Sequence, residues 1–371
     1  MKDNALSSRP IIPIPARPTP CLPSHLIRLD TVTIMSAYLE DRMAFSVFIS
    51  RQIPRCGVDW LRARDVTVTL SPVDRPLTLD ELIASARASD GLLSMLTDPI
   101  GEPFLAACPT LRAVSQFAVG TNNIDLAACQ RRGVGVANTP GVLTDATAET
   151  AFALLLACAR RIVESDVYLR DHATLFGERP MTNDWTGWGP LQFLGQGIVG
   201  QTLGIVGAGR IGCRLAKMAA GFDMQLLYTS RRPSDEMARR GARHVELDDL
   251  LAQSDFVSMH LPATAETRHL IDARRLSLMK PTAILINTAR GSVVDEAALI
   301  IALKAGRIFA AGLDVFEHEP SLIPGLCDLP NVVILPHVGS ATVQTRDKMS
   351  LIAAENLLGM LNGKGAKYPV K

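Results

Sequence analysis

The chain has 371 residues, more than the roughly 100 to 200 of a single domain, so we expect two domains. Hydrophobic residues make up 47% and charged residues 20%, which is typical of a globular protein with a large core and excludes bulk disorder. The 38 basic and 37 acidic side chains nearly cancel, so no overall field would attract nucleic acid or an anionic membrane.

Cysteine usage and apolar runs narrow the class of protein further. No apolar run approaches the roughly 18 residues that a membrane-spanning helix needs, so we expect a soluble protein. The seven cysteines are odd in number, dispersed and without CxxC spacing. This pattern argues against a disulfide framework and against a metal site, and it predicts a cytoplasmic location.

The first 42 residues differ in composition from the rest. Six prolines lie between Pro10 and Pro23, and proline both prevents a helix and removes backbone donors. We therefore expect residues 1–42 to be a disordered extension. Its role stays open, because a start codon assigned upstream of Met43 would explain it equally well.

From Met43 onward, short β-branched runs alternate with amphipathic segments such as Leu79–Arg87. The runs are FSVFIS, VTVTL, LRAVSQF and VGVAN, and the alternation predicts βαβ units around a parallel sheet. After residue 140, the segment Asp145–Ile162 is too long and too apolar for a strand, so it predicts a buried helix that could link two domains.

A second α/β series begins with LGIVG at Leu203. It continues through QLLYT, DFVSMHL, AILINTA, FAAGLDV and VVILPHV. Because these runs are almost continuously hydrophobic, both faces of the sheet should be covered, as in a doubly wound fold. Thr345–Leu361 predicts a final amphipathic helix that returns to the first domain.

A glycine-rich turn follows the first strand of this series, Leu203–Val206. The turn consists of Gly207, Ala208, Gly209, Arg210, Ile211 and Gly212, and a helical run comes directly after it. Glycine permits the tight turn and the close approach of the backbone to a pyrophosphate, whose charge faces the helix N-terminus. An ordinary tight turn is the alternative, but the strand before it and the helix after it favour dinucleotide binding.

The end of the next strand, Gln225–Tyr228, indicates which dinucleotide is bound. An NAD site usually places a carboxylate there for the adenosine ribose, but this chain has Thr229, then Ser230, Arg231 and Arg232. Guanidiniums suit an additional 2′-phosphate, so we predict NADPH as the preferred cofactor, with NADH possible. The alternative is that both arginines simply cover a solvated loop.

Three polar side chains follow apolar strands of the second series. They are Arg290 in NTARGSVVDEAAL, Glu319 in GLDVFEHEP and His337 in LPHVGSAT. Residues at strand ends face the ligand crevice of an open α/β sheet. An arginine can hold the carboxylate and carbonyl of a 2-oxo acid, a histidine can protonate the forming alkoxide, and a carboxylate can keep that histidine charged. Taken one at a time, each could equally be a solvated loop residue.

Several longer segments carry a resemblance to a known family. They include VGTNNIDL at Val119, GVLTDATAETAFALLLACARR at Gly141, WTGWGP at Trp185 and SDFVSMHLPATAETRHLI at Ser254. With the three segments above, they make the chain resemble the D-isomer-specific 2-hydroxyacid dehydrogenases from Met43 to the C-terminus. Among these it is most similar to the glyoxylate/hydroxypyruvate reductases.

The resemblance implies an α/β protein with two Rossmann-like, doubly wound parallel-sheet domains. The dinucleotide-binding domain, residues 141–337, would be inserted into a flavodoxin-like substrate domain made of residues 43–140 and 338–371. Arg290 would bind the substrate carboxylate and carbonyl, His337 would be the acid/base and Glu319 its partner. The backbone N–H groups of Val119 and Gly120 would hold the carboxylate from the other domain.

Further contacts follow from the same resemblance. Cofactor contacts are implied for Thr147 and Asp314 at the nicotinamide end, for Leu261 and Pro262 on the adenine side, and for Thr288 and Gly339. The family's usual Gly-Tyr-Asp is Gly120, Thr121 and Asn122 in this chain, which should tune the loop without removing the amide cradle. Trp185 and Trp188 lie in an arm-like stretch that in similar reductases crosses to the partner of a homodimer. Trp188 would either wall the partner's substrate pocket or only bury area at the interface.

The sequence therefore predicts a homodimeric NADPH-dependent reductase of glyoxylate or hydroxypyruvate. Two alternatives stay open. One is an NAD-dependent D-2-hydroxyacid dehydrogenase of another substrate such as 3-phosphoglycerate. The other is a dinucleotide-sensing, corepressor-like binding protein, since such relatives resemble the enzymes at the same three positions.

Overall fold

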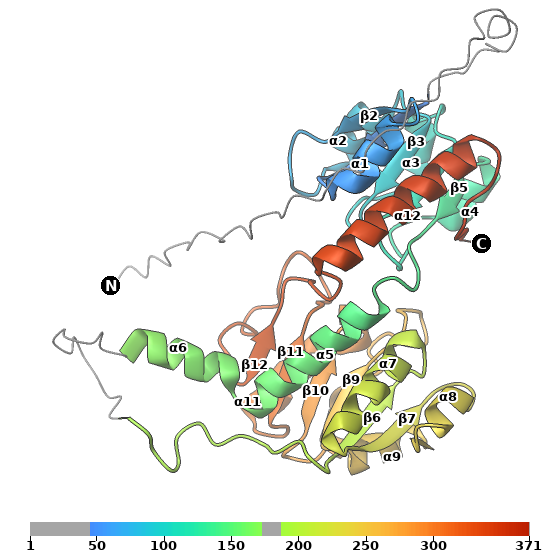
Figure 1. Cartoon of the computed structure of the whole chain (residues 1–371). Helices are drawn as coiled ribbons and strands as arrows, with labels where there is room; N and C mark the ends of the chain where they lie inside the picture. Colours follow the sequence, from blue (N-terminus) through green and yellow to red (C-terminus); the bar gives the residue numbers. More distant parts are fainter. Residues whose placement is uncertain (1–44, 173–186, 371) are drawn as a thin grey trace, which may run out of the picture. The chain divides into compact units, whose positions relative to one another are not determined.

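The structure is a computed structural model that describes residues 45–172 and 187–370 (Figure 1). The predicted extension 1–42 and Trp185 lie outside these residues. Residues 45–370 contain two parallel sheets, and we call each sheet with its covering helices the first and the second lobe.

The first lobe is built on a five-stranded sheet in the order β2-β1-β3-β4-β5. Its elements are β1 (Ser46–Ile49), α1 (Arg55–Arg62), β2 (Thr67–Leu70), α2 (Leu79–Ala86), β3 (Gly91–Ser94), α3 (Glu102–Ala107), β4 (Ala113–Gln116), α4 (Leu126–Arg131) and β5 (Gly135–Ala137). All pairings are parallel, and the strand order is that of flavodoxin.

The second lobe is built on a seven-stranded parallel sheet in the order β12-β11-β10-β9-β6-β7-β8. Its elements are β6 (Thr202–Val206), α7 (Arg210–Ala219), η1 (Ala220–Phe222), β7 (Gln225–Thr229), α8 (Asp235–Ala238), β8 (Arg243–His244), α9 (Leu247–Gln253), β9 (Phe256–Met259), α10 (Ala273–Leu278), β10 (Ile284–Asn287), η2 (Gly291–Val293), α11 (Glu296–Lys304), β11 (Ala310–Leu313) and β12 (Val332–Ile334). Counted from β6, this is the Rossmann order 3-2-1-4-5-6 with one strand added.

Three helices connect or extend the lobes. They are α5 (Thr144–Ala159), α6 (Ile162–His172) and α12 (Val343–Leu361). The predicted helix 145–162 is interrupted by Arg161, whose φ of +51° is left-handed and ends the regular backbone before α6 begins. The helix α12 packs against α1, β3 and β4, so the end of the chain returns to the first lobe.

Both sheets are covered on both faces. In β1, Phe48 belongs to one buried cluster of the first lobe, whereas Val47 and Ile49 belong to the other, as the alternation of a strand requires. Two further clusters cover the faces of the second sheet, with Tyr228 in one and Leu227 in the other. The predicted doubly wound α/β fold is confirmed.

Close packing between α1 and α12 holds the end of the chain against the first lobe. A Cβ added to Gly57 of α1 would overlap the side chain and carbonyl of Ser350, and the Gly57 N–H donates to the Ser350 hydroxyl at 3.2 Å. The two helices therefore approach more closely than most side chains would allow.

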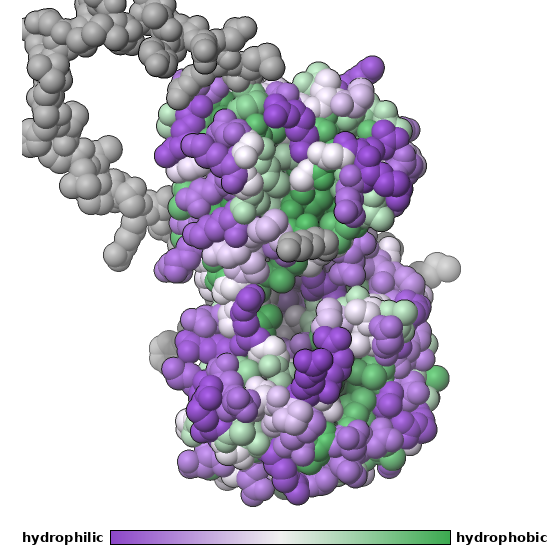
Figure 2. Space-filling model, turned by 90° about the vertical axis from the view of Figure 1, so that its right-hand side faces the viewer, coloured by the Kyte–Doolittle hydropathy of each residue, from purple (hydrophilic) through white to green (hydrophobic). Residues whose placement is uncertain are grey.

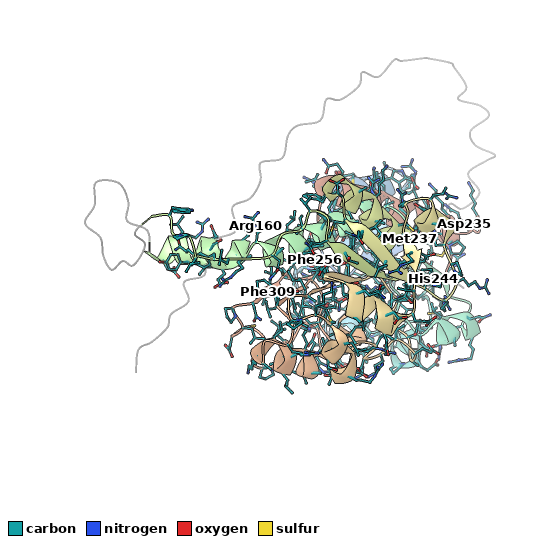
Figure 3. All side chains as sticks on the ribbon, turned by 90° about the horizontal axis from the view of Figure 1, so that it is seen from below. Arg160, Asp235, Met237, His244, Phe256 and Phe309 are labelled. Atoms are coloured by element: carbon teal, nitrogen blue, oxygen red, sulfur yellow. The ribbon has the colours of Figure 1, made fainter. Side chains whose placement is uncertain are left out.

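Two strands were absent from the prediction. The run of β3, GLLS, has no β-branched residue, although all four of its residues are buried. The strand β8 has only two residues, and Tyr228 of the neighbouring β7 stacks against its His244 with ring centroids 4.9 Å apart. In Figure 3, His244 and Met237 of α8 lie away from Arg160, which separates α5 from α6.

Within the described residues, no helix is long and apolar enough to cross a membrane.

Candidate active site

A cleft with a cavity volume of 1190 Å³ lies between the lobes (Figure 2). It is lined from the first lobe by the loops after β1, β2, β3 and β4 and from the second lobe by the loops after β9, β10, β11 and β12. The crevice at the carboxyl ends of parallel strands is where open α/β sheets bind their ligands. The loops that carry the predicted substrate and catalytic residues therefore meet at this cleft.

The glycine turn after β6 has the close backbone contacts that a dinucleotide fold needs. Gly207 has a φ of +110°, and a Cβ there would overlap the carbonyl of His260. A Cβ on Gly212 would in turn overlap the Gly207 carbonyl, so only glycine allows α7 to lie this near to β6. Gly209 is the N-cap of α7, which leaves the first N–H groups of that helix available to an anion.

The other residues of the turn lie in different surroundings. Ile211 lines the cleft, whereas Arg210 lines a smaller cavity beside Arg214 and Lys217 of the same helix. The backbone of the turn, including Ala208, is thus the part that fits a pyrophosphate, and the Arg210 side chain points to a separate surface. The glycine turn therefore fits the nicotinamide dinucleotide that the sequence predicts.

The loop after β7 presents two free cations. Arg231 and Arg232 are both exposed, and within the described residues neither guanidinium takes part in a hydrogen bond or an ion pair. The Ser230 hydroxyl donates to the Arg232 carbonyl at 2.6 Å, which tightens the loop. The charge of Arg231 contributes to lowering the pKa of Glu266, after the larger effect of a hydrogen bond from Thr264.

Leu261 and Pro262 line the cleft next to the glycine turn. The Thr267 hydroxyl donates to the Pro262 carbonyl at 2.7 Å and accepts from the Thr264 N–H at 2.8 Å. These bonds give the loop a fixed backbone, so its apolar side chains present a fixed wall to the ligand.

His337 and Glu319 form a hydrogen-bonded pair. Nδ1 of His337 lies 2.8 Å from Oε2 of Glu319, whose Oε1 accepts the Phe316 N–H at 2.9 Å. Burial alone would raise the pKa of Glu319, but the bond to His337, the charge of His337 and the Phe316 N–H together lower it. Glu319 is therefore a carboxylate near neutral pH, and it orients the imidazole from one side.

Arg290 is half-buried at the end of β10. The Asn287 amide donates to the Arg290 carbonyl at 2.9 Å, and Nη1 of Arg290 donates to the Ala289 carbonyl at 2.6 Å. Burial lowers the pKa of Arg290, an effect that the Glu319 charge partly offsets. The neighbouring Thr288 also lines the cleft, and its buried hydroxyl has no hydrogen-bond partner in the described part of the chain.

The two lobes meet at the Arg290 guanidinium. A Cβ built on Gly120 of the first lobe would overlap the guanidinium, so a larger residue at this position would have to displace the Arg290 side chain. Val119 and Gly120 both line the cleft. The structure thus brings Gly120, Arg290 and the His337–Glu319 pair to one cleft.

Asp314 ties the loop after β12 to β11. Its two oxygens accept the Val338 and Gly339 N–H groups at 2.7 and 2.8 Å. The Gly339 Cα faces Thr147, since an added Cβ would lie 3.5 Å from the threonine methyl. Burial raises the pKa of Asp314, and the two N–H donors oppose that effect.

Sequence reasoning missed the polar network beneath Gly120. Gln116 is fully buried and donates to the Gly120 carbonyl at 3.3 Å and to the Asn123 side chain at 2.8 Å. It also accepts from the Ser94 hydroxyl at 2.5 Å. These bonds hold the backbone of the cradle loop, the loop after β4 that carries Val119 and Gly120. Nothing in the local sequence distinguishes Gln116 from any other strand residue.

Other cleft residues were not predicted either, among them His260 and Arg346. Nε2 of His260 lies 2.8 Å from the Ser258 hydroxyl, and burial lowers the pKa of His260 to about 4. His260 is therefore neutral at physiological pH.

Trp188 was predicted as a site residue, but its side chain is 88% exposed and is not part of the cleft of its own chain. Within the described residues, no group of acidic, histidine or cysteine side chains is placed to hold a metal ion.

The fold and the cleft define a dinucleotide-dependent α/β oxidoreductase. The sequence profile of the D-isomer specific 2-hydroxyacid dehydrogenase NAD binding domain matches residues 152–339. The glyoxylate reductase of Thermococcus litoralis is 48% identical over 320 residues, which cover 86% of this chain and 94% of that protein.

Solved structures agree with this assignment. The crystal structure of a protein from Thermus thermophilus has a TM-score of 0.80 and 41% identity, covering 88% of this chain and 100% of that one. The NADPH-dependent glyoxylate/hydroxypyruvate reductase of Sinorhizobium meliloti, in complex with NADP and malonate, has a TM-score of 0.75 and 32% identity, covering 88% and 97%. This chain belongs to the D-isomer-specific 2-hydroxyacid dehydrogenase family and is an NAD(P)-dependent oxidoreductase.

The lowered pKa of Glu319 makes a prediction about stability. A carboxyl group whose pKa is lower in the folded state stabilises the protein above its unfolded pKa, and the effect disappears as the pH falls through the folded pKa. Glu319→Gln should therefore unfold roughly 1–3 °C below the wild type at pH 7, and the difference should shrink toward pH 3. Thermal unfolding followed by circular dichroism measures this. Glu149→Gln, which changes an exposed carboxylate, is the control, and a Glu319→Gln difference that grows on acidification would contradict the assignment.

Proposed function

We propose that this chain is an NADPH-dependent reductase that converts small 2-oxo acids, glyoxylate and hydroxypyruvate, to D-2-hydroxy acids. The observation that carries the proposal is the convergence of Arg290, Gly120 and the His337–Glu319 pair on one cleft. The glyoxylate reductase from Thermococcus litoralis supports the substrate class, and the NADP complex of the Sinorhizobium meliloti reductase supports the cofactor.

The carboxylate of the 2-oxo acid would be held from both lobes. The Arg290 guanidinium would bind the carboxylate and the carbonyl oxygen, and the N–H groups of Val119 and Gly120 would donate to the carboxylate. A planar guanidinium fixes both oxygens at once, whereas an ammonium group would act only as a point charge. This arrangement orients the carbonyl carbon and polarises its bond to oxygen.

His337 would donate the proton to the carbonyl oxygen. Its Nδ1 is held by Glu319 at 2.8 Å, so Nε2 is the nitrogen available to the substrate. Thr147, Asp314 and Gly339 would hold the nicotinamide end of the cofactor, which would supply the hydride to the carbonyl carbon when bound. The carbon thus gains a hydride and the oxygen a proton, which gives the hydroxy acid.

The proton-donor role predicts different kinetic effects for two substitutions. His337→Gln should lower kcat about 10²- to 10⁴-fold with little change in KM, because the proton is transferred in the transition state. Arg290→Met should raise KM for the 2-oxo acid and also lower kcat, because this side chain holds the carboxylate throughout the reaction. Steady-state kinetics with glyoxylate at saturating NADPH measures both effects.

A second histidine–glutamate pair in the chain provides a matched control. His269 lies 2.8 Å from Glu317 but does not line the cleft. His269→Gln should keep near wild-type turnover. If His337→Gln also kept near wild-type turnover at neutral pH, then His337 would not be the proton donor.

The NADPH preference is proposed from the two free arginines after β7. In the Arg231→Ala/Arg232→Ala double variant, kcat/KM for NADPH should fall about 10- to 100-fold, because two charge-assisted contacts to the 2′-phosphate would be lost. The value for NADH should change little, since NADH has no such phosphate. Arg239→Ala removes an exposed cation from the neighbouring α8 and is the control. A wild type that is more efficient with NADH, and insensitive to the double substitution, would overturn the proposal.

A homodimer is proposed from the exposed apolar side chains of α6 and the stretch 187–199. Eight of the eleven exposed large apolar side chains of the described residues lie there, and α6 extends away from the second sheet in Figure 1. Such a surface is typical of an interface between subunits. Trp188 would either line the partner's cleft or only be buried at this interface.

The double variant Leu191→Asp/Leu194→Asp should be monomeric in sedimentation equilibrium, because charged side chains would enter an apolar interface. Ile301→Asp places the same charge on an exposed residue of α11 outside that surface, and it should leave the dimer intact. A wild type that sediments as a monomer would refute the proposal. In a dimer, a raised KM for the 2-oxo acid in Trp188→Ala would favour the role in the partner's pocket.

A further inference from the structure

The cleft contains two arginines that the mechanism above does not use, Arg51 and Arg346. Arg51 is paired with Asp74 at 3.0 Å. Arg346, in contrast, has no such partner among the described residues. It lies in the first turn of α12, where its N–H donates to the carbonyl of the N-cap Thr342 at 2.9 Å. The side chain is half-buried, lines the cleft, and has its guanidinium carbon 5.9 Å from the centre of the Phe117 ring. It therefore faces the cleft from the first lobe, as Arg290 does from the second.

The guanidinium of Arg346 has no bonded acceptor among the described residues. The acids around it are engaged elsewhere: both oxygens of Asp314 accept backbone N–H groups, and Glu319 binds His337. Asp347, next to it on α12, has its carboxylate 3.7 Å from the Cys56 sulfur. A half-buried guanidinium loses hydration that only water or a bound ligand can replace here. Burial accordingly lowers the pKa of Arg346.

Arg346 is positioned to contact the substituent on the carbonyl carbon, which is the one part of the substrate that the proposed mechanism leaves without a protein partner. In the proposed function the carboxylate would bind Arg290 and the Gly120 N–H, the carbonyl oxygen would bind His337, and the residues around Asp314 would hold the nicotinamide. The substituent on the carbonyl carbon must then face another wall of the cleft. The remaining first-lobe wall carries Arg346 among the apolar side chains of Met95, Leu96, Phe117 and Met349. Its other polar side chains include Thr97, Gln52, whose amide donates to the Ser71 carbonyl, and Arg51, which is paired with Asp74 at 3.0 Å. Arg346 is thus the arginine of this wall that has no carboxylate bonded to it among the described residues.

We propose that Arg346 is a specificity residue that binds an oxygen on C3 of the 2-oxo acid. The preferred substrates are then 2-oxo acids with a hydroxyl or an anionic oxygen on C3, and those with a hydrogen or methyl group there are disfavoured. This inference rests on the proposed function, because it assigns one more group of the same substrate.

A purely electrostatic role is the main alternative. The Arg346 charge also acts on Asp314, so the arginine could serve only as a counter-ion for that buried carboxylate. In that case its loss would disturb the nicotinamide end of the cleft and affect every substrate alike. A C3 contact, in contrast, affects only substrates that carry the oxygen.

The test compares three substrates with NADPH: hydroxypyruvate, pyruvate and glyoxylate. Arg346→Met keeps the length of the side chain and removes its charge. The ratio of kcat/KM for hydroxypyruvate to that for pyruvate should fall about 10- to 100-fold, and kcat/KM for glyoxylate, which lacks C3, should change less than threefold. Arg346→Lys keeps the charge without the planar fork and should give an intermediate ratio.

Lys348→Met removes an exposed charge from the same helix and should leave all three values unchanged. Equal losses on the three substrates, or an unchanged ratio in Arg346→Met, would overturn the role of Arg346 while wild-type activity upholds the proposed function. A wild type that reduces none of the three substrates would overturn the proposed function itself, and the role of Arg346 with it. Melting temperature and NADPH binding by fluorescence show whether each variant is folded.

Discussion

The site depends on the close approach of the Arg290 guanidinium to the Gly120 backbone. These residues belong to different lobes, and their contact leaves no room for a Cβ on residue 120. Because backbone N–H groups and a planar cation then face the same point, a carboxylate bound there would be held from two directions. The cleft is therefore a product of both lobes together, and neither sheet alone carries the complete site.

Around this contact two carboxylates of the protein are engaged by hydrogen bonds, whereas two arginines have no carboxylate bonded to them within the described residues. Asp314 accepts two backbone N–H groups, and Glu319 accepts one N–H group and holds His337. Arg290 and Arg346, in contrast, have no carboxylate bonded to them within the described residues. A ligand with two oxygen-bearing ends suits such a cleft, because each end can meet one cation without displacing an existing ion pair.

The fold and the principal side chains could be predicted from local sequence because each follows an apolar strand. A residue that closely follows an apolar strand must lie at the crevice edge, so Arg290 and His337 could be placed without knowledge of packing. Arg346 could not be placed in this way. It lies on the final helix, whose position depends on contacts such as that between Gly57 and Ser350, nearly three hundred residues apart in sequence. Gln116 was missed for a related reason, since a buried glutamine at the end of a strand becomes informative only when its partners are known.

Asn122 stands where the family's usual Gly-Tyr-Asp pattern has an aspartate, and this difference has a structural consequence. The Asn122 side chain donates to the Ala263 carbonyl at 3.3 Å, across the cleft in the loop that also carries Leu261 and Pro262. The aspartate that the related sequences usually have at this position would be ionised at neutral pH, and a carboxylate has no proton to donate to a carbonyl. The amide can make the bond, so in this chain the cradle loop is tied to the second lobe as well as to Gln116 beneath it. Asn122 thus adds a link between the lobes next to Gly120, and the N–H groups of Val119 and Gly120 stay without an acceptor among the described residues.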